Sequence, residues 1–135
     1  MEVGSISAFL LFFFSALILI VIFLYLYSLV TPYDDYALIF EQNNTAAALA
    51  FGGAMIGVSI PLYSALVGSV SYGDFLMWGS VAIAIQLIFA FIATRLIKGK
   101  YSFKQRIEKD VIPVGIFMAF LSISVGLLNA GSMSY

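Results

Sequence analysis

The stretch EQNNTAAALAFGGAMIGVSIPLYSA, residues 41–65, is long enough to cross a bilayer but consists largely of small residues. It carries two adjacent glycines, a third glycine at position 57 and a proline at position 61. Lipid favours bulky apolar side chains, so this composition needs a structural reason. Small residues let helix backbones approach closely in a membrane, where association depends on packing and hydrogen bonding. The stretch therefore predicts a membrane helix that packs tightly against a second helix.

The small residues of this stretch recur every three or four positions, which places them on one face of a helix. Residues 115–126 show the same pattern. Pro61 removes the hydrogen bond to the carbonyl group of Gly57, so we expect a local bend there. Two arrangements remain open: an inner pair of helices within one chain, or an interface between subunits. The residues of this predicted helix-packing face are Ala46, Ala50, Gly53, Gly57, Pro61, Gly115, Ala119, Ser122 and Gly126.

The composition places the whole chain in a membrane. Hydrophobic residues make up 63% of the 135 residues and charged residues only 10%, whereas the surface of a soluble domain must stay hydrated. Four uncharged runs, at 3–33, 42–73, 75–94 and 111–135, each reach the roughly 20 residues that a membrane-spanning helix requires. We expect a single all-α transmembrane domain over 1–135 with four transmembrane helices. The first run is too long for a signal peptide and is expected to be a retained helix.

The two halves of the chain resemble each other. In each half, a helix with a bulky run that is expected to face lipid, FLLFFF at 9–14 or LIFAFI at 87–92, is followed by a stretch rich in small residues. Shifting the chain on itself by about 66 positions aligns several Phe, Ala and Ile residues. The pattern predicts two tandem helical hairpins, at about 5–66 and about 74–133, arranged as a parallel repeat.

The charges predict the orientation in the membrane. Basic loops stay cytoplasmic, so loops 31–44 and 95–110 are expected on the cytoplasmic side and both termini on the periplasmic side. Loop 31–44 is acidic, and the two loops could pair with each other, contact lipid headgroups or dock a membrane or cytoplasmic partner protein. The basic residues all lie in or beside the second of these loops: Arg95, Lys98, Lys100, Lys104, Arg106 and Lys109.

The residue types exclude several kinds of chemistry. The chain has no Cys and no His, which excludes disulfides, thiolate chemistry and the common zinc sites. Charged residues lie only at the ends of the predicted spans or in loops, which disfavours proton-coupled transport. The sequence shows no nucleophile–base pair, metal cluster or phosphate loop. We therefore expect no enzyme activity, catalytic residue, cofactor, metal or nucleic-acid partner.

Uncharged polar residues are the remaining candidates for a site. Gln86 and Asn129 lie inside predicted spans, where exposure to lipid is costly. They could form an interhelical hydrogen bond. Alternatively, together with Ser59 and Tyr63, they could line a narrow polar path between subunits.

Other polar residues are expected at the membrane surface. Asn44 and Thr45 are predicted to cap the second spanning helix, because their side-chain oxygens can accept hydrogen bonds from its free amide groups. The residues after Asp34 and Asp35 suit a short helix in the interface. The aromatic residues expected to face the lipid headgroups are Tyr27, Tyr33, Tyr72 and Trp78.

Several motifs resemble a known family. They are YSLVTPYDDYALI (27–39), NNTAAALAFGGAMIG (43–57), WGSVAIAIQL (78–87) and GLLNAGSMSY (126–135). In this order and spacing they resemble the YjfL-like family of small bacterial inner-membrane proteins, known as domain-of-unknown-function family 350. The most specific of these motifs is the Asn-Thr-Ala-Ala step at Asn44–Ala47. In that family a similar step also opens the last helix, whereas residues 110–113 here read Asp-Val-Ile-Pro.

The resemblance implies four spans, two tandem hairpins, an inner-membrane location and a loose association with envelope-stress and amide-ligase-like proteins. It brings no molecular activity and no catalytic residue. The leading hypothesis is a self-associating scaffold, or a membrane subunit of an envelope-associated assembly. The alternative hypothesis is a homo-oligomeric channel or passive transporter for ions or small solutes.

Overall fold

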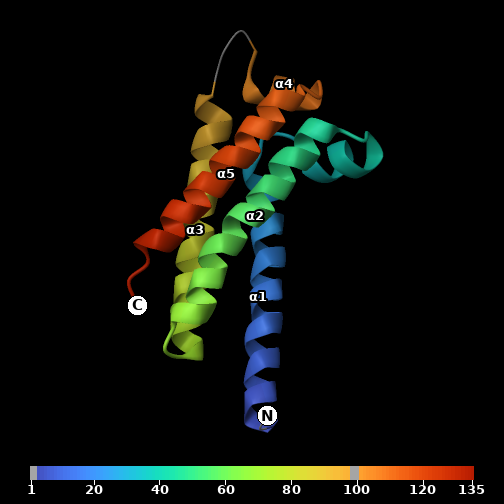
Figure 1. Cartoon of the computed structure of the whole chain (residues 1–135). Helices are drawn as coiled ribbons and strands as arrows, with labels where there is room; N and C mark the ends of the chain where they lie inside the picture. Colours follow the sequence, from blue (N-terminus) through green and yellow to red (C-terminus); the bar gives the residue numbers. More distant parts are fainter. Residues whose placement is uncertain (1–2, 98–100) are drawn as a thin grey trace.

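The computed structural model describes residues 3–97 and 101–135, which form a bundle of helices (Figure 1). The described part contains no strand, which confirms the predicted all-α class. Of the residues behind the predicted orientation, Lys98 and Lys100 lie outside the described residues. The helices are α1 (Val3–Val30), η1 (Ala37–Glu41), α2 (Thr45–Gly68), α3 (Tyr72–Leu96), α4 (Phe103–Glu108) and α5 (Ile112–Ser132).

Four of these helices are long and apolar enough to cross a membrane. The candidate spans are Ser5–Val30, Thr45–Gly68, Tyr72–Leu96 and Ile112–Ser132, in agreement with the predicted count. Helices satisfy their backbone hydrogen bonds internally, which is the condition for a segment that crosses lipid. The short helix η1 is π-helical, and it provides the short helix expected after Asp34 and Asp35.

The centre of the bundle is the contact between α2 and α5, which is the most extensive contact between two elements. All nine residues of the predicted helix-packing face are buried within the chain. A methyl group at Gly53 would overlap Ala119, and one at Gly115 would overlap the backbone of Ala46. The small residues therefore bring two helices of the same chain together, and the face is not available to a second copy.

Helices α2 and α5 also approach each other closely beside Pro61. Proline cannot donate a hydrogen bond to the carbonyl group of Gly57, four residues earlier, so that carbonyl is free of its usual helical partner. It lies directly against Gly126 of α5, where any side chain would overlap it. Such contacts allow weak Cα–H···O interactions between helices. Gly57, Pro61 and Gly126 thus form one packing unit.

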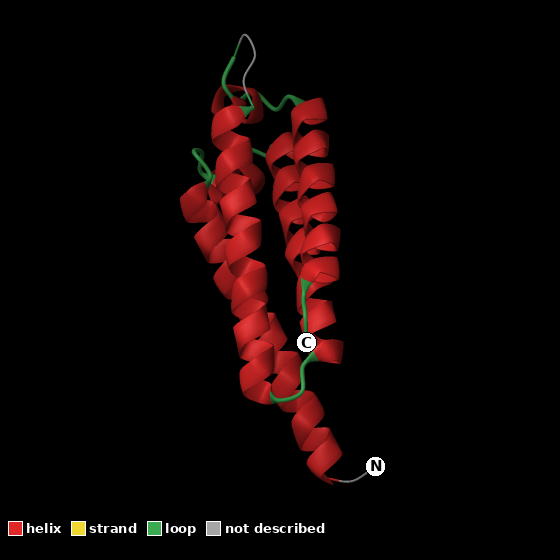
Figure 2. Cartoon of the chain, turned by 90° about the vertical axis from the view of Figure 1, so that its left-hand side faces the viewer, coloured by secondary structure: helices red, strands yellow, loops and turns green. Residues whose placement is uncertain are grey.

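Helix α1 packs less closely than the others. Its N-terminal part extends beyond the rest of the bundle (Figure 2). Phe9 and Phe14 are more than half exposed there, as expected for side chains that face lipid. The second half of α1 contributes the buried residues Phe23 and Tyr27 to the main core.

The two polar loops lie at the same end of the bundle. Residues 31–44 and helix α4 meet at the end where α1 and α3 finish and α2 and α5 begin (Figure 1). The ring of Tyr33 stacks on Phe103 of α4 with 6.1 Å between ring centroids. Both chain ends lie towards the opposite end of the bundle (Figure 1).

The expected headgroup-facing role of Tyr27 and Tyr33 was wrong. Tyr27 is completely buried and Tyr33 is 4% exposed, because Tyr27 packs against Phe51 of α2 and Tyr33 stacks on Phe103 of α4. Tyr72 is partly buried and its hydroxyl group forms a 2.7 Å hydrogen bond with Ser15 of α1. Trp78 packs against Tyr135 near the C-terminus.

The order of elements is the same in both halves of the chain. A long helix is followed by a short helix, a residue with positive φ and a second long helix. The positive-φ residues are Asn43 (φ 53) and Asp110 (φ 58), each directly before the N-cap of the next long helix. This shared plan is what a duplication would produce, and the internal repeat stays a prediction.

Gly126→Ala should destabilise the protein, because the added methyl group overlaps the backbone oxygen of Gly57 and no side chain can move aside. Overpacking of this kind typically costs about 1–3 kcal/mol. Thermal unfolding in detergent measures the effect. Gly131→Ala is the matched control on the same helix, since a methyl group there meets no other atom. Equal melting temperatures for the two variants would contradict the tight contact.

Candidate functional site

The loop end of the bundle holds the N-termini of α2 and α5 together. Asn44 is the N-cap of α2: its Oδ1 atom accepts a hydrogen bond from the amide of Ala47 at 2.8 Å. The Nδ2 atom of Asn44 donates to the carbonyl oxygen of Ile107 at 2.7 Å. Thr45, by contrast, is the first helical residue and is exposed, so of the two predicted capping residues only Asn44 is the N-cap.

Asp110 completes this arrangement from the other half of the chain. Its Oδ1 atom accepts a 2.7 Å hydrogen bond from the amide of Ala46, in the first turn of α2. The carboxylate also lies two residues before the start of α5. Helix N-termini carry partial positive charge, so a carboxylate between two of them is favourable. The departure from the family motif at Asp110 therefore supplies a cap for the opposite helix.

The two loops meet through uncharged groups and helix caps. The contacts are those of Asn44, Asp110 and the Tyr33–Phe103 pair. Within residues 3–97 and 101–135 no ion pair joins the acidic loop to the basic loop. Among the described residues, the two loops therefore contact each other within one chain by hydrogen bonding and packing.

A second polar cluster lies in the middle of the bundle. The Nε2 atom of Gln86 on α3 donates to the carbonyl oxygen of Ser122 on α5 at 3.2 Å. The Nδ2 atom of Asn129 donates to the carbonyl oxygen of Ala82 at 3.2 Å and to Oε1 of Gln86 at 3.4 Å. Both side chains are buried, so the amide pair ties α3 to α5.

The other two candidates for a polar path lie elsewhere. Ser59 donates to the carbonyl oxygen of Met55 within α2, and Tyr63 is 67% exposed on the outward side of the same helix. The structure therefore brings Gln86 and Asn129 together but leaves Ser59 and Tyr63 apart from them. The cavity next to Gln86 measures about 10 Å³, which is close to the least space that one water molecule requires.

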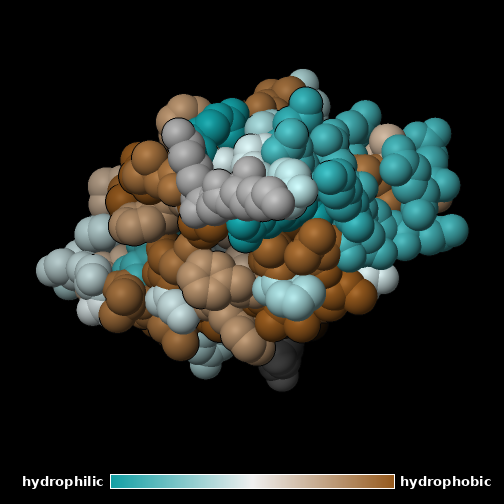
Figure 3. Space-filling view, turned by 90° about the horizontal axis from the view of Figure 1, so that it is seen from above, coloured by the Kyte–Doolittle hydropathy of each residue, from teal (hydrophilic) through white to brown (hydrophobic). Residues whose placement is uncertain are grey.

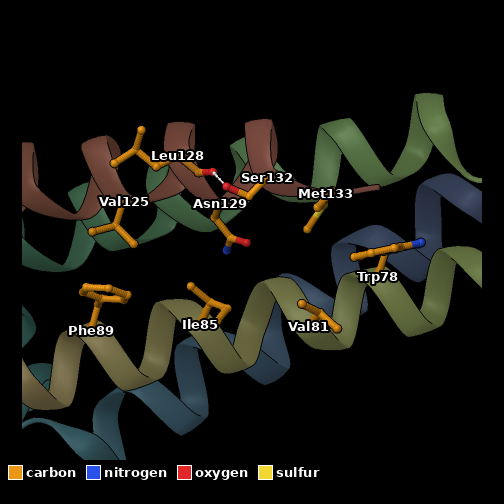
Figure 4. A pocket seen from close by; sticks show the side chains of 9 residues that line it. All are labelled: Trp78, Val81, Ile85, Phe89, Val125, Leu128, Asn129, Ser132 and Met133. Carbon is orange, nitrogen blue, oxygen red and sulfur yellow. Dashed lines mark hydrogen bonds between the residues drawn. The ribbon is translucent and has the colours of Figure 1, made fainter. Parts of the chain in front are cut away.

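An apolar cavity of about 380 Å³ lies between α3 and α5 (Figure 4). Asn129 points into it from α5, whereas the hydroxyl group of Ser132 bonds to the carbonyl oxygen of Leu128. Such a lining can hold hydrocarbon but provides no group for acid–base chemistry. The lining residues are Trp78, Val81, Ile85, Phe89, Val125, Leu128, Asn129, Ser132 and Met133.

The titratable group that the sequence analysis overlooked is Asp35. It follows α1 in the loop, yet it is only 1% exposed. Thr31, four residues earlier, donates a 2.5 Å hydrogen bond to its Oδ2 atom. Burial raises the pKa of the Asp35 carboxyl group from 3.8 to about 7, although the hydrogen bond from Thr31 opposes this and the charge of Asp34 adds to it. The signal that could have found it is the Thr31–Pro32 pair directly after α1, because proline favours a turn.

The fold and these contacts define a membrane protein with four transmembrane helices. The model of the family described as Domain of Unknown Function (DUF350) matches residues 1–133. The chain therefore belongs to the DUF350 family, as the motifs predicted. It is 38% identical to UPF0719 inner membrane protein YjfL of Escherichia coli K12 over 131 residues, which are 97% of this chain and 96% of that protein.

A second relative is UPF0719 transmembrane protein YshE of Bacillus subtilis. It is 34% identical over 119 residues, which are 83% of this chain and 81% of YshE. No solved structure matches the chain. The names of these relatives describe membrane proteins and assign no reaction to them.

Asp35 should make the stability of the protein depend on pH. The folded state holds the Asp35 proton more tightly than the unfolded chain, so the free energy of unfolding should fall as the pH rises from about 4 to about 7 and then level off. Asp35→Asn removes this contribution. Between these two pH values the melting temperature of the unmodified protein should fall by several degrees more than that of Asp35→Asn. Both proteins are measured in choline chloride. Parallel pH profiles would contradict the buried carboxyl group.

Proposed function

We propose that the protein is a non-enzymatic subunit of the bacterial inner membrane that self-associates through the outward side of α2. The relatives' names support the location, since one is called an inner membrane protein and the other a transmembrane protein. The observation that carries the proposal is a second set of small residues, which faces away from α5. This set consists of Ala48, Gly52 and Ser59, and we call it the outer face of α2.

The adjacent glycines of α2 point to different neighbours. Gly53 lies against Ala119 inside the chain, whereas a methyl group at Gly52 would meet no atom. Ala48 is exposed and Ser59 half-buried on the same side of the helix as Gly52. Small residues on a lipid-facing helix surface let another helix approach closely at those positions, while the exposed Met55 and Tyr63 on the same side would pack around the contact. The outer face of α2 thus has the composition of a helix-association surface.

The polar end of the bundle supports a docking role for the loops. Seen from that end, hydrophilic side chains gather over one side and apolar side chains over the other (Figure 3). Exposed charged residues there include Asp34, Glu41, Lys104 and Lys109. We assign this end to the cytoplasm because basic loops stay on that side, which places both termini in the periplasm. A membrane or cytoplasmic partner protein would then meet loops 31–44 and 95–110 together.

The channel hypothesis gains no support from the geometry of one chain. Gln86 and Asn129 use their amide groups in bonds between α3 and α5. Ser59 belongs to the outer face of α2, and Tyr63 lies on the same outward side of that helix. Flux of ions or solutes is therefore not part of the proposed function.

Gly52→Leu tests the proposal. The variant should fold normally, because the side chain enters open space, but it should weaken self-association by at least about tenfold, which corresponds to about 1.4 kcal/mol. Native mass spectrometry of protein extracted from membranes and chemical cross-linking in lipid bilayers measure the fraction of oligomer. Both methods also reveal any second protein that binds in fixed ratio.

Two controls separate association from folding. Ala84→Leu places the same bulk on the exposed side of α3 and should leave the oligomer unchanged. Gly53→Leu should lower the melting temperature strongly, because it forces α2 and α5 apart. An unaltered oligomer in the Gly52→Leu variant would overturn the proposed interface.

A further inference from the structure

Three buried oxygen atoms without a hydrogen-bond partner lie at the junction of α1 and the following loop. They are Oδ1 of Asp35 and the phenol oxygens of Tyr27 and Tyr33. Buried polar groups are almost always hydrogen-bonded, so each exception needs an explanation. Here three exceptions fall within nine consecutive residues of the chain. Their concentration indicates that a polar ligand binds among them.

The three groups are close enough to act on one another. The phenol groups of Tyr27 and Tyr33 approach each other, although without good hydrogen-bond geometry, and both interact electrostatically with the carboxyl group of Asp35. The Oγ1 atom of Thr31 lies between two further oxygens of the cluster: it donates to Oδ2 of Asp35 and also approaches the backbone carbonyl oxygen of Tyr33 at 3.3 Å. The cluster therefore brings together a carboxylate, hydroxyl groups and a carbonyl group.

Among metal ions, the donor atoms favour a hard cation. Every polar side-chain atom of the cluster is an oxygen, and oxygen ligands suit alkali and alkaline-earth ions rather than soft transition metals. The cluster contains one buried carboxylate, so a monovalent cation would make it neutral, whereas a divalent cation would leave a positive charge in an apolar setting. Among the described residues no Lys or Arg forms an ion pair with Asp35 to fill this role.

We propose that Tyr27, Thr31, Tyr33 and Asp35 form a binding site for one alkali cation, Na⁺ or K⁺. The ion links the last turn of α1 to the segment that leads into η1. The site is separate from the outer face of α2, so the cation proposal can be tested independently of self-association.

Two further observations agree with this site. Asp35 also lines a cavity of about 280 Å³ between α1, η1 and α2, so its carboxyl group borders open space, whereas Tyr27, Thr31 and Tyr33 do not line this cavity. The titratable groups that act on Asp35 are Asp34, Tyr27 and Tyr33, and Asp34 increases the negative potential.

The test compares thermal unfolding in NaCl, KCl, MgCl₂ and choline chloride at equal ionic strength and pH 8. A ligand that binds only the folded state raises the melting temperature with the logarithm of its concentration. We expect Na⁺ or K⁺ to raise it by a few degrees relative to choline, with little effect of Mg²⁺. Asp35→Asn should abolish the shift, and Glu41→Gln, which changes an exposed carboxylate, should keep it.

Tyr27→Phe tests whether the phenol hydroxyl group binds the cation, and it changes no charge. If the phenol hydroxyl group had no ligand, its removal would stabilise the protein, because a buried unsatisfied group would be gone. If the hydroxyl group binds the cation, the variant should instead lose most of the shift caused by Na⁺ or K⁺. Equal melting temperatures in alkali and choline salts, stabilisation by Mg²⁺ alone, or an unchanged alkali shift in Tyr27→Phe would each overturn the proposal.

Discussion

The close approach of α2 and α5 fixes the position of the other elements. Lipid gives apolar helices no hydrophobic reason to associate, so packing and backbone contacts must hold them together. Gly53 meets Ala119, and the free carbonyl group of Gly57 meets Gly126. At this separation the carbonyl oxygen of Ser122 comes within reach of Gln86, which attaches α3. A bulkier residue on either helix would therefore loosen three helices rather than two.

The same contact explains the polar end of the bundle. Both α2 and α5 begin there, so their positively charged N-terminal ends lie side by side. Gly115 lies against Ala46, which leaves no room for side chains between the two first turns. Asp110 reaches the amide of Ala46 across this gap, and Asn44 reaches the carbonyl group of Ile107 in the other direction. The loops are thus anchored by two crossing hydrogen bonds, and they form one surface rather than two independent connections.

Sequence patterns predicted the four spans and the pairing of the small-residue helices, because length, hydropathy and helical spacing are local properties. They did not separate Gly52 from Gly53, since the direction of each residue depends on how the whole helix is rotated towards α5. They also misplaced Tyr27 and Tyr33, because the rings that bury them, Phe51 and Phe103, lie far away in the sequence. Asp110 looked like a degraded motif because its partner, Ala46, lies in the other half of the chain. Asp35 looked like any loop carboxylate for the same reason: burial is a property of the tertiary structure.

The buried polar groups of this protein fall into two kinds, and the difference indicates where ligand chemistry is concentrated. Gln86 and Asn129 have protein partners for their amide groups, so their burial is accounted for by helix packing. Tyr27, Tyr33 and Asp35 each retain an oxygen without a partner. Leaving such groups unsatisfied costs on the order of 1–3 kcal/mol each, and an apolar residue of similar shape would avoid that cost. A cluster of three is hard to reconcile with packing alone, whereas a bound cation would satisfy all three at once. The mid-membrane amide pair is therefore a structural element, and the junction between α1 and η1 is the part of the molecule suited to sensing an ion.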